Sequence, residues 1–85
     1  MIKVFIAVLN AHFKNCLYGT NLIQRLSDLV NNEFPIIETY NDASIAKIDI
    51  NGTCTIVFNL SENGYIKCID VKQKCYTLYN NVKEK

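Results

Sequence analysis

The stretch Lys3-Val4-Phe5-Ile6-Ala7-Val8-Leu9-Asn10 decides the fold that the sequence predicts. Its six central residues, Val4 to Leu9, are all apolar, so a strand at this place would have no polar side. Such a strand is typical of the middle of a sheet that is covered on both faces. The run is too short to cross a membrane, which takes about 20 apolar residues. We therefore predict a central β-strand here, with the rest of the chain built outward from it.

Length and composition indicate one folded domain, residues 1–85. Hydrophobic residues make up 49% of the chain, which is ample for a core and far above the range of disordered chains. A chain of this size buries only about two thirds of its unfolded surface, so association would widen a thin margin of stability. The net charge is +1 and the basic residues are dispersed, so a long nucleic acid is not an expected partner.

The cysteines are expected to be reduced thiols, because three of the four lie in apolar stretches and free cysteine is among the most buried residue types. They are Cys16, Cys54, Cys68 and Cys75. His12 and Cys16 lie four residues apart, but no Cys-x-x-Cys pair or second histidine joins them, so no metal site and no cofactor is expected. The first apolar run lacks the long apolar region and cleavage site of a secretory signal. These features predict a cytoplasmic protein without a membrane partner, located in the host cytoplasm if a phage encodes it.

A helix is predicted from about residue 20 to residue 32. Thr20 or Asn21 can accept from the free N–H groups of its first turn. Apolar residues then recur at helical spacing and form one stripe: Leu22, Ile23, Leu26, Leu29 and Val30. Pro35 ends the helix and holds the residue before it in an extended conformation.

Five later segments have the composition or alternation of strands, and turn residues separate them. They are residues 36–40, 45–50, 53–58, 65–71 and, as a last edge strand, 75–79. Asn51-Gly52 is a strong hairpin signal because both residues tolerate positive φ, and Ser61 to Gly64 forms a second turn. The polar tail, 80–85, is expected to fray.

This order predicts an α+β fold: a mostly antiparallel sheet with one helix on one face, similar to a truncated ferredoxin-like or PII-like domain. One helix covers one face only, whereas the apolar strand at Val4–Leu9 requires cover on both. We therefore expect a homo-oligomer that forms through the other face. The turn after that strand, Asn10 to Lys14, would then line an intersubunit pocket.

Four residues are candidates for catalysis. Glu38 and Asp42 flank Tyr40, and Asp49 lies on the next predicted strand. Carboxylates beside an aromatic ring suit a cationic ligand, since a ring face adds about 0.5–2 kcal/mol in a dry site. The alternative is that Glu38 and Asp49 are ordinary solvent-facing residues and that Asp42 forms a turn.

The turn after the first apolar run supplies candidate substrate-binding residues: Asn10, His12 and Phe13. His12 has the acid–base range that catalysis near neutral pH requires, and its alternative role is that of an ordinary surface histidine. No nucleophile elbow, catalytic triad or phosphate-binding glycine loop is visible. A further alternative is a platform for single-stranded nucleic acid, built from tyrosines near dispersed lysines: Tyr65, Tyr76 and Tyr79.

The order of these pieces resembles a known enzyme family. Val4 to Asn15, the amphipathic helix and then Ile37-Glu38-Thr39-Tyr40-Asn41-Asp42 are similar to the N-terminal half of the phage S-adenosylmethionine lyases, formerly called hydrolases. Cys54-Thr55-Ile56-Val57-Phe58 resembles the final hairpin of that family. Family members carry a second helix before this hairpin, and the present chain is too short to hold it.

The resemblance implies a homotrimer with intersubunit active sites and no metal or cofactor. The substrate's own carboxylate would attack its γ-carbon, releasing methylthioadenosine and leaving homoserine lactone. The protein would hold the substrate in a near-attack geometry, while an acidic and an aromatic side chain stabilise its charges. The family's tyrosine is matched by Tyr40, and its essential glutamate by Glu38, Asp42, Asp49 or Glu62.

Two functions remain open at this point. The first is a lyase for S-adenosylmethionine or for its adenylated derivative, SAM-AMP, which is a signal in some CRISPR defence; its role would be phage counter-defence or signal removal. The alternative is a non-enzymatic phage or mobile-element protein that binds a host defence component or a small nucleotide.

Overall fold

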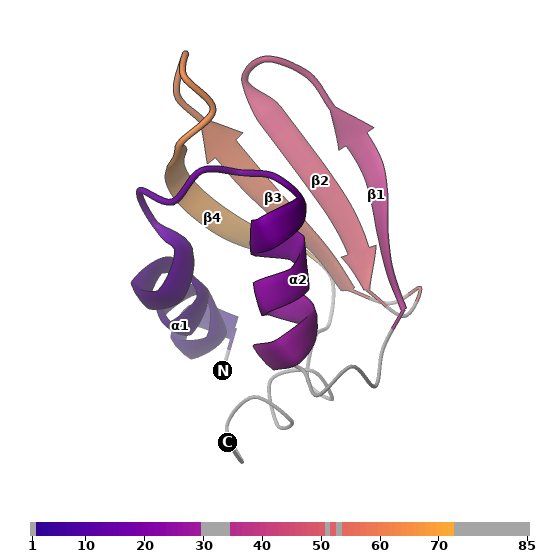
Figure 1. Ribbon diagram of the computed structural model, residues 1–85. Coiled ribbons are helices and arrows are strands. Elements are labelled where there is room, and N and C mark those ends of the chain that lie inside the picture. The colour runs from indigo at the N-terminus through magenta and orange to yellow at the C-terminus, as the bar shows by residue number, and fades with distance from the viewer. Residues whose placement is uncertain (1, 30–34, 51, 53, 73–85) are drawn as a thin grey trace.

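The computed structural model describes residues 2–29, 35–50, 52 and 54–72, which form two helices and a four-stranded sheet (Figure 1). Two helices come first, and the four strands follow them: α1 (Ile2–Phe13), α2 (Thr20–Leu29), β1 (Ile36–Asn41), β2 (Ile45–Ile50), β3 (Cys54–Leu60) and β4 (Ile66–Lys72). Each strand pairs antiparallel with the next, in the order β1-β2-β3-β4. The predicted α+β class with an antiparallel sheet is confirmed.

The prediction of a central strand at Val4–Leu9 is wrong, because this run belongs to helix α1. Phe5, Leu9 and Phe13 recur every four residues, and each is at most 2% exposed. Val4 and Ala7 lie on the exposed side of the helix. Since these exposed positions are also apolar, the sequence shows no polar face, and a short apolar run does not distinguish a buried strand from a helix. The sheet is therefore accompanied by two helices rather than by the one that was predicted.

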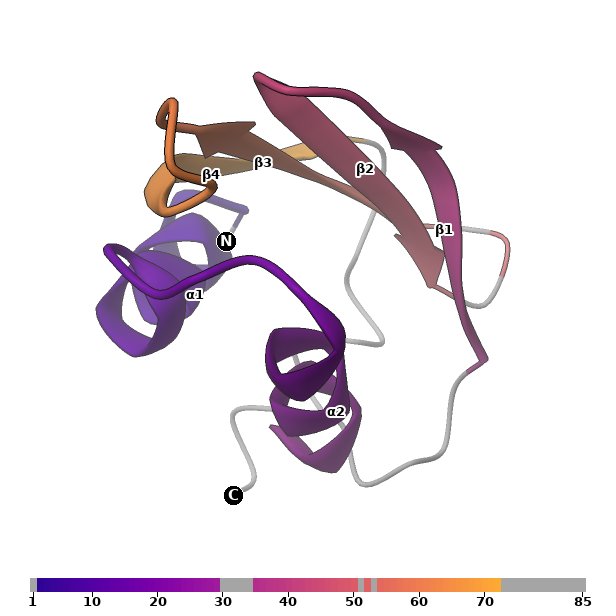
Figure 2. The same cartoon turned by 45° about the horizontal axis from the view of Figure 1, so that its top comes forward.

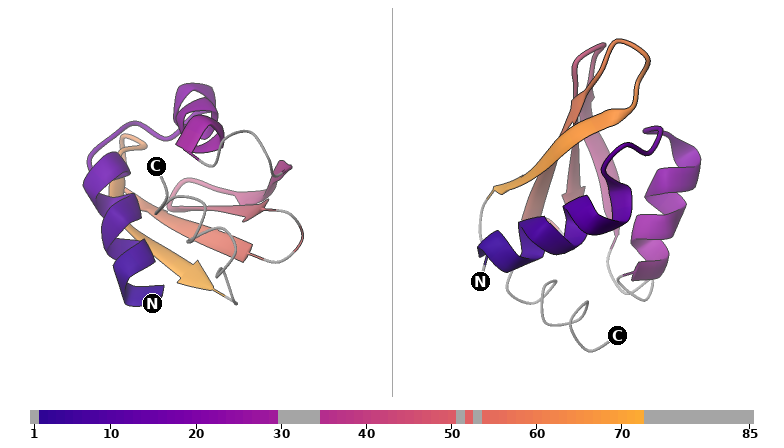
Figure 3. Two further views of the ribbon diagram at one scale, coloured as in Figure 1. Left: turned by 90° about the horizontal axis from the view of Figure 1, so that it is seen from below. Right: turned by 90° about the vertical axis from the view of Figure 1, so that its left-hand side faces the viewer.

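Both helices lie on the same face of the sheet (Figure 2). Helix α1 packs against β4, and α2 lies on the same side (Figure 3). We call the face toward the helices the inner face and the opposite one the outer face. Among the elements that the structure describes, none covers the outer face.

The hydrophobic core lies between the helices and the inner face. Side chains on a strand alternate between its two faces, and the inner positions of the three later strands are buried: Ala46, Ile48, Ile50, Cys54, Ile56, Phe58, Leu60, Ile66, Ile69 and Val71. Leu22 and Leu26 of α2 join them and Leu29 packs beside them, which confirms this part of the predicted stripe; Val30 lies outside the described residues. Strand β1 adds only the half-buried Ile36.

The connection between the helices is fixed to the β3–β4 hairpin. The backbone N–H of Ile66 donates to the carbonyl of Cys16 at 2.9 Å, and that of Tyr18 donates to the carbonyl of Gly64 at 3.0 Å. Asn15 adopts a φ of 71°, in the left-handed region that asparagine tolerates. This segment therefore holds the end of α1 and the start of α2 in fixed positions.

The strand predictions at 36–40, 45–50, 53–58 and 65–71 agree with β1 to β4 to within two residues at each end. Gly52 and Gly64 adopt positive φ values of 71° and 83°, as their places in the hairpin turns require. The strand predicted at 75–79, the tail at 80–85 and the end of the helix beyond residue 29 lie outside the described residues.

The expectation of reduced thiols throughout is wrong for Cys54, which is disulfide-bonded. Its partner lies outside the described residues. Cys16 and Cys68 are free, and Cys68 is exposed.

Candidate functional site

A shallow groove lies between the end of α1 and helix α2. Its volume is about 330 Å³, and five residues line it: His12, Phe13, Arg25, Asp28 and Leu29. The first two come from the last turn of α1, and the other three from the later turns of α2. The groove thus exists only because the apolar run at the start of the chain is a helix that ends beside α2.

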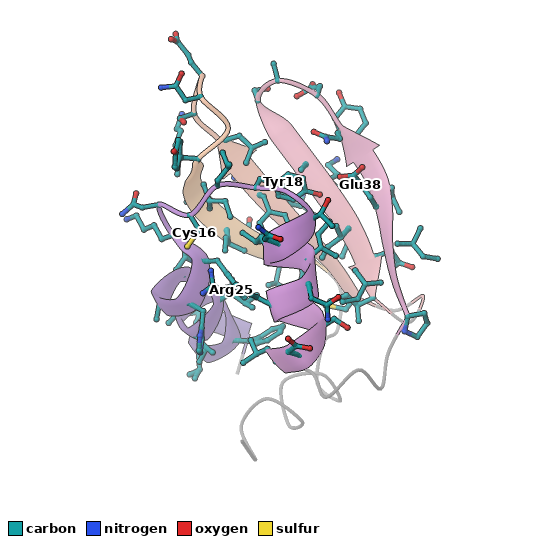
Figure 4. All side chains as sticks on the ribbon, viewed as in Figure 1. Cys16, Tyr18, Arg25 and Glu38 are labelled. Carbon is teal, nitrogen blue, oxygen red and sulfur yellow. The ribbon has the colours of Figure 1, made fainter. Side chains whose placement is uncertain are left out.

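Arg25 is the cation of this groove, and neighbouring groups hold its guanidinium in place. Nη2 donates to the carbonyl of His12 at 3.3 Å, and Nη1 donates to Sγ of Cys16 at 3.6 Å. The guanidinium carbon lies 5.1 Å from the centre of the Phe13 ring, which is cation–π distance. Figure 4 shows Arg25 and Cys16 side by side where the two helices meet. A guanidinium has five N–H donors, so donors remain for a ligand.

The other walls of the groove combine an acceptor with apolar surface. Asp28 accepts from Nε2 of Gln24 at 3.1 Å, which holds its carboxylate along the helix surface. The exposed His12 ring is tilted against the ring of Phe13, with centroids 5.8 Å apart. One cation, one carboxylate and an apolar floor therefore share one concave surface.

The predicted substrate-binding residues have different roles. Asn10 is half-buried and joins α1 to β4: Nδ2 donates to the carbonyl of Ile69, and the backbone N–H of Ile69 donates to Oδ1, both at 3.1 Å. The side-chain amide of Asn10 thus bonds both the N–H and the C=O of Ile69 on β4, the last strand of the sheet. Phe13 is buried and forms the groove floor, while His12 lines the groove from its exposed side.

Glu38 forms a separate contact with the segment before α2. The hydroxyl of Tyr18 donates to Oε2 of Glu38 at 2.5 Å, and Nδ2 of Asn41 donates to the same oxygen at 3.4 Å. The two labelled side chains approach each other between this segment and β1 in Figure 4. Burial raises the pKa of Tyr18 far above its usual value, and the hydrogen bond to Glu38 and the charge of Glu38 raise it further. Tyr18 is therefore a neutral hydrogen-bond donor at physiological pH.

Tyr40 and Asp42 form a second pair at the end of β1. The Tyr40 hydroxyl donates to Oδ2 of Asp42 at 2.7 Å, and the backbone N–H groups of Ser44 and Ile45 donate to Oδ1 at 2.7 and 2.8 Å. The hydrogen bond from Tyr40 and these backbone bonds lower the pKa of Asp42 to about 2. The same hydrogen bond raises the pKa of Tyr40. Asp42 therefore fixes the β1–β2 turn as an ionised acceptor.

The four predicted catalytic residues do not form one site, because the strand register divides them. Glu38 is opposite Ile48, which faces the core, whereas Tyr40 is opposite Lys47, which faces outward. A register shift between Glu38 and Tyr40 is the cause, since one extra residue turns the next side chain to the other face. Asp49 lies on the outer face. Only Tyr40 and Asp42 are brought into contact.

Sequence reasoning did not find Arg25, Asp28 or Leu29 as groove residues. Arg25 and Asp28 are polar positions on the solvent side of an amphipathic helix, where charged residues are expected without any function. The one available signal was the spacing of four residues between His12 and Cys16, both of which accept a hydrogen bond from Arg25 of α2. This spacing indicates a contact with α2 only when residues 2–13 are recognised as a helix.

Comparisons with known proteins give no relative: no protein family, curated protein or solved structure matches this chain. Within the described residues, no group of three or more His, Cys, Asp or Glu side chains is placed to hold a metal ion. No helix in the described part of the chain has the length and apolar character needed to cross a membrane.

Proposed function

We propose that the protein is a non-enzymatic binding protein whose α1–α2 groove holds a small phosphate-bearing ligand of mononucleotide size. The observation that carries this proposal is the position of Arg25. Its guanidinium lines the groove and is held by a carbonyl, a thiol and an aromatic ring. A pre-positioned guanidinium suits phosphate, because its planar fork binds two oxygens and little side-chain entropy is lost on binding.

The remaining groove residues agree with the other parts of a nucleotide. Asp28 is an acceptor suited to ribose hydroxyls or to an exocyclic amino group. Phe13 and Leu29 offer apolar surface to a base or sugar. The volume of about 330 Å³ is at the lower end of the range of small-molecule sites, which is about 300–1,000 Å³, so a single nucleotide fits better than a dinucleotide.

The experiment is a titration of the full chain with adenosine monophosphate, followed by calorimetry and by amide NMR shifts. We expect AMP to bind at least about tenfold more tightly than adenosine, because a charge-assisted pair contributes about 1.5–3 kcal/mol. Arg25→Gln should remove this preference, and Arg25→Lys should keep part of it, because lysine retains the charge but not the fork. Lys67→Gln, which removes the same charge from an exposed residue of β4 that does not line the groove, is the matched control.

Equal affinity for AMP and adenosine would contradict a phosphate site. Amide shifts that fall outside the last turn of α1 and the later turns of α2 would contradict the groove. Circular dichroism of each variant separates a lost ligand contact from a lost fold, because Arg25 also touches Phe13 of the core.

Cleavage of S-adenosylmethionine or SAM-AMP is the second candidate function. One observation favours it: Asp42 is an exposed carboxylate with a lowered pKa, hydrogen-bonded to the aromatic Tyr40. An ionised carboxylate beside a ring is the combination that attracts a sulfonium cation. Against it stands the division of the four predicted residues between the two faces. In this second proposal the protein is a homotrimer, as the family resemblance implies, and it acts in phage counter-defence.

The lyase proposal is tested by incubating the protein with each sulfonium substrate, without metal, and measuring methylthioadenosine or its adenylated form. If product forms, Asp42→Asn or Tyr40→Phe should lower kcat about 100-fold or more, the scale of an electrostatic contributor. Glu38→Gln and Asp49→Asn are the controls from the other sites. Absence of product from both substrates excludes the lyase.

The cytoplasmic location proposed from the sequence has its own test. Disulfides persist mainly in oxidising compartments, and Cys54 is disulfide-bonded. Thiols are alkylated inside intact cells, and the peptides are then analysed by mass spectrometry without reduction. Alkylated Cys54 supports the cytoplasm, whereas an oxidised Cys54 excludes a reducing compartment.

A further inference from the structure

The outer face of the sheet carries two adjacent rows of side chains, and each row crosses all four strands. The strand register defines the first row as Tyr40, Lys47, Val57 and Asp70. It defines the second row as Ile37, Asp49, Thr55 and Lys72. Each strand thus contributes one residue to each row.

The charges in these rows alternate in both directions. Strand β2 carries Lys47 in the first row and Asp49 in the second, whereas β4 carries Asp70 in the first and Lys72 in the second. Across the sheet, each lysine is therefore aligned with an aspartate two strands away. The four charges sum to zero, so the face does not attract a strongly charged partner.

The first strand adds an apolar part to the same face. Ile37 is 60% exposed and Tyr40 is 48% exposed, although both are large hydrophobic side chains. On β1, Tyr40 belongs to the first row and Ile37 belongs to the second. On the central strand β3, between the charged strands, Thr55 is half-buried and Val57 is only 6% exposed, so the apolar surface open to a partner comes from β1.

We propose that the outer face is the interface of a homodimer, in which two sheets pack face to face about a two-fold axis. The axis runs across the strands, midway between the two rows. Each strand then lies over the same strand of the second copy with its rows exchanged. Lys47 faces Asp49 of the partner subunit, Asp70 faces the partner's Lys72, and Tyr40 faces the partner's Ile37.

A second copy suits this face better than an unrelated partner because the pattern is self-complementary. A two-fold contact places the same patch against itself, so it requires opposite charges at the positions that the axis exchanges. Lys47 with Asp49, and Asp70 with Lys72, meet this requirement on two separate strands. Packed sheets lie about 10 Å apart and within about 30° of alignment, which brings facing side chains of the two rows into contact.

A different two-fold axis, parallel to β3, also pairs opposite charges, because it places Lys47 over Asp70 of the partner subunit. In that arrangement β2 lies over the partner's β4, and β1 extends beyond the edge of the partner's sheet. Ile37 and Tyr40 would then keep their exposure. The axis across the strands buries them, so the apolar pair on β1 decides between the two arrangements.

The first experiment measures the mass of the full chain by light scattering and by sedimentation over a range of concentrations. We expect twice the mass of one chain. Lys47→Glu should weaken the dimer about tenfold or more, because the two-fold axis converts two attractive pairs into repulsive ones. Lys14→Glu makes the same charge change on an exposed residue after α1 and should leave the dimer unchanged.

The second experiment exchanges charges and tests the direction of the axis. Lys47→Glu combined with Asp49→Lys should restore the wild-type dissociation constant, because the exchanged residues face each other again. Lys47→Glu combined with Asp70→Lys should not restore it. Restoration by the second pair alone would overturn the proposed axis, and a monomer or trimer at every concentration would overturn the dimer.

Discussion

The two faces of the sheet are made by the same strands, yet they differ in what they contribute. On β2, Ala46, Ile48 and Ile50 are at most 1% exposed, whereas Lys47 and Asp49 between them are half-buried. The inner face excludes water and accounts for most of the hydrophobic stabilisation. The outer face places charges in a regular pattern and contributes little to folding. Because side chains alternate along each strand, the buried apolar side chains and the solvent-facing charged side chains of β2 lie on opposite faces.

The largest expected effect comes from two aromatic truncations on opposite faces. Phe58→Ala empties a fully buried inner position and should lower the free energy of unfolding by about 3–5 kcal/mol. Tyr40→Ala on the outer face removes an exposed ring and one hydrogen bond to Asp42, and should cost about 1 kcal/mol, the scale of a single hydrogen bond. Urea unfolding at neutral pH, below the concentration at which chains associate, measures both. Equal costs would refute the division between the faces.

A smaller effect is expected where α1 joins the sheet. Asn10→Ala removes the two hydrogen bonds to Ile69 and leaves the N–H and C=O of an edge strand without their side-chain partner. The expected cost is about 1–3 kcal/mol. Amide exchange should accelerate at Ile69 more than at residues of β2. Unchanged protection of Ile69 would show that water replaces the side chain without loss.

A pH dependence is expected at the end of β1. The folded-state pKa of Asp42, about 2, lies below its ordinary value of 3.8, so the stabilisation is complete above pH 3.8 and is lost as the pH falls toward 2. Asp42→Asn should flatten the unfolding free energy over this window. Tyr40→Phe should flatten it partly, because it removes only the hydroxyl donor. Thermal unfolding from pH 5 to pH 2 measures the three slopes, and parallel slopes would contradict the assignment.

The smallest effect is expected on the outer face itself. Asp49→Asn should change the stability of the monomer by less than about 0.5 kcal/mol, as is usual for surface substitutions. Its effect on association should be larger than its effect on folding, because Asp49 faces a lysine in the proposed dimer. Comparing unfolding at low concentration with the dissociation constant separates the two. A folding loss above 1 kcal/mol, by the same surface rule, would mean that Asp49 acts within the sheet.

Much of the sheet is readable from the sequence because its signals are local. Alternation at 45–50 and the glycines at 52 and 64 predicted β2, β3 and the hairpin turns, since side-chain period and positive φ depend on neighbouring residues only. The stripe in α2 was readable for the same reason. Helix α1 was not, because its exposed positions Val4 and Ala7 are as apolar as its buried ones.

The candidate site was predicted less well, because it depends on contacts between distant segments. The sequence pointed to His12 and Phe13, which do line the groove, but not to Arg25, whose role arises from the ends of two helices meeting. It also grouped Glu38 with Tyr40, and the register shift at β1 places them on opposite faces. A register shift of one residue cannot be predicted from the composition or the spacing of the sequence.

The sequence by itself thus determined an α+β domain with an antiparallel meander and one amphipathic helix. The tertiary structure decided that the first apolar run is a helix, that both helices share one face, and that the other face carries a mixture of charged and apolar side chains. The physical reason is that local patterns fix which side of an element is apolar, whereas only packing fixes what that side meets. For Lys3–Asn10 even the local pattern is ambiguous, and burial of Phe5 and Leu9 against the sheet settles it.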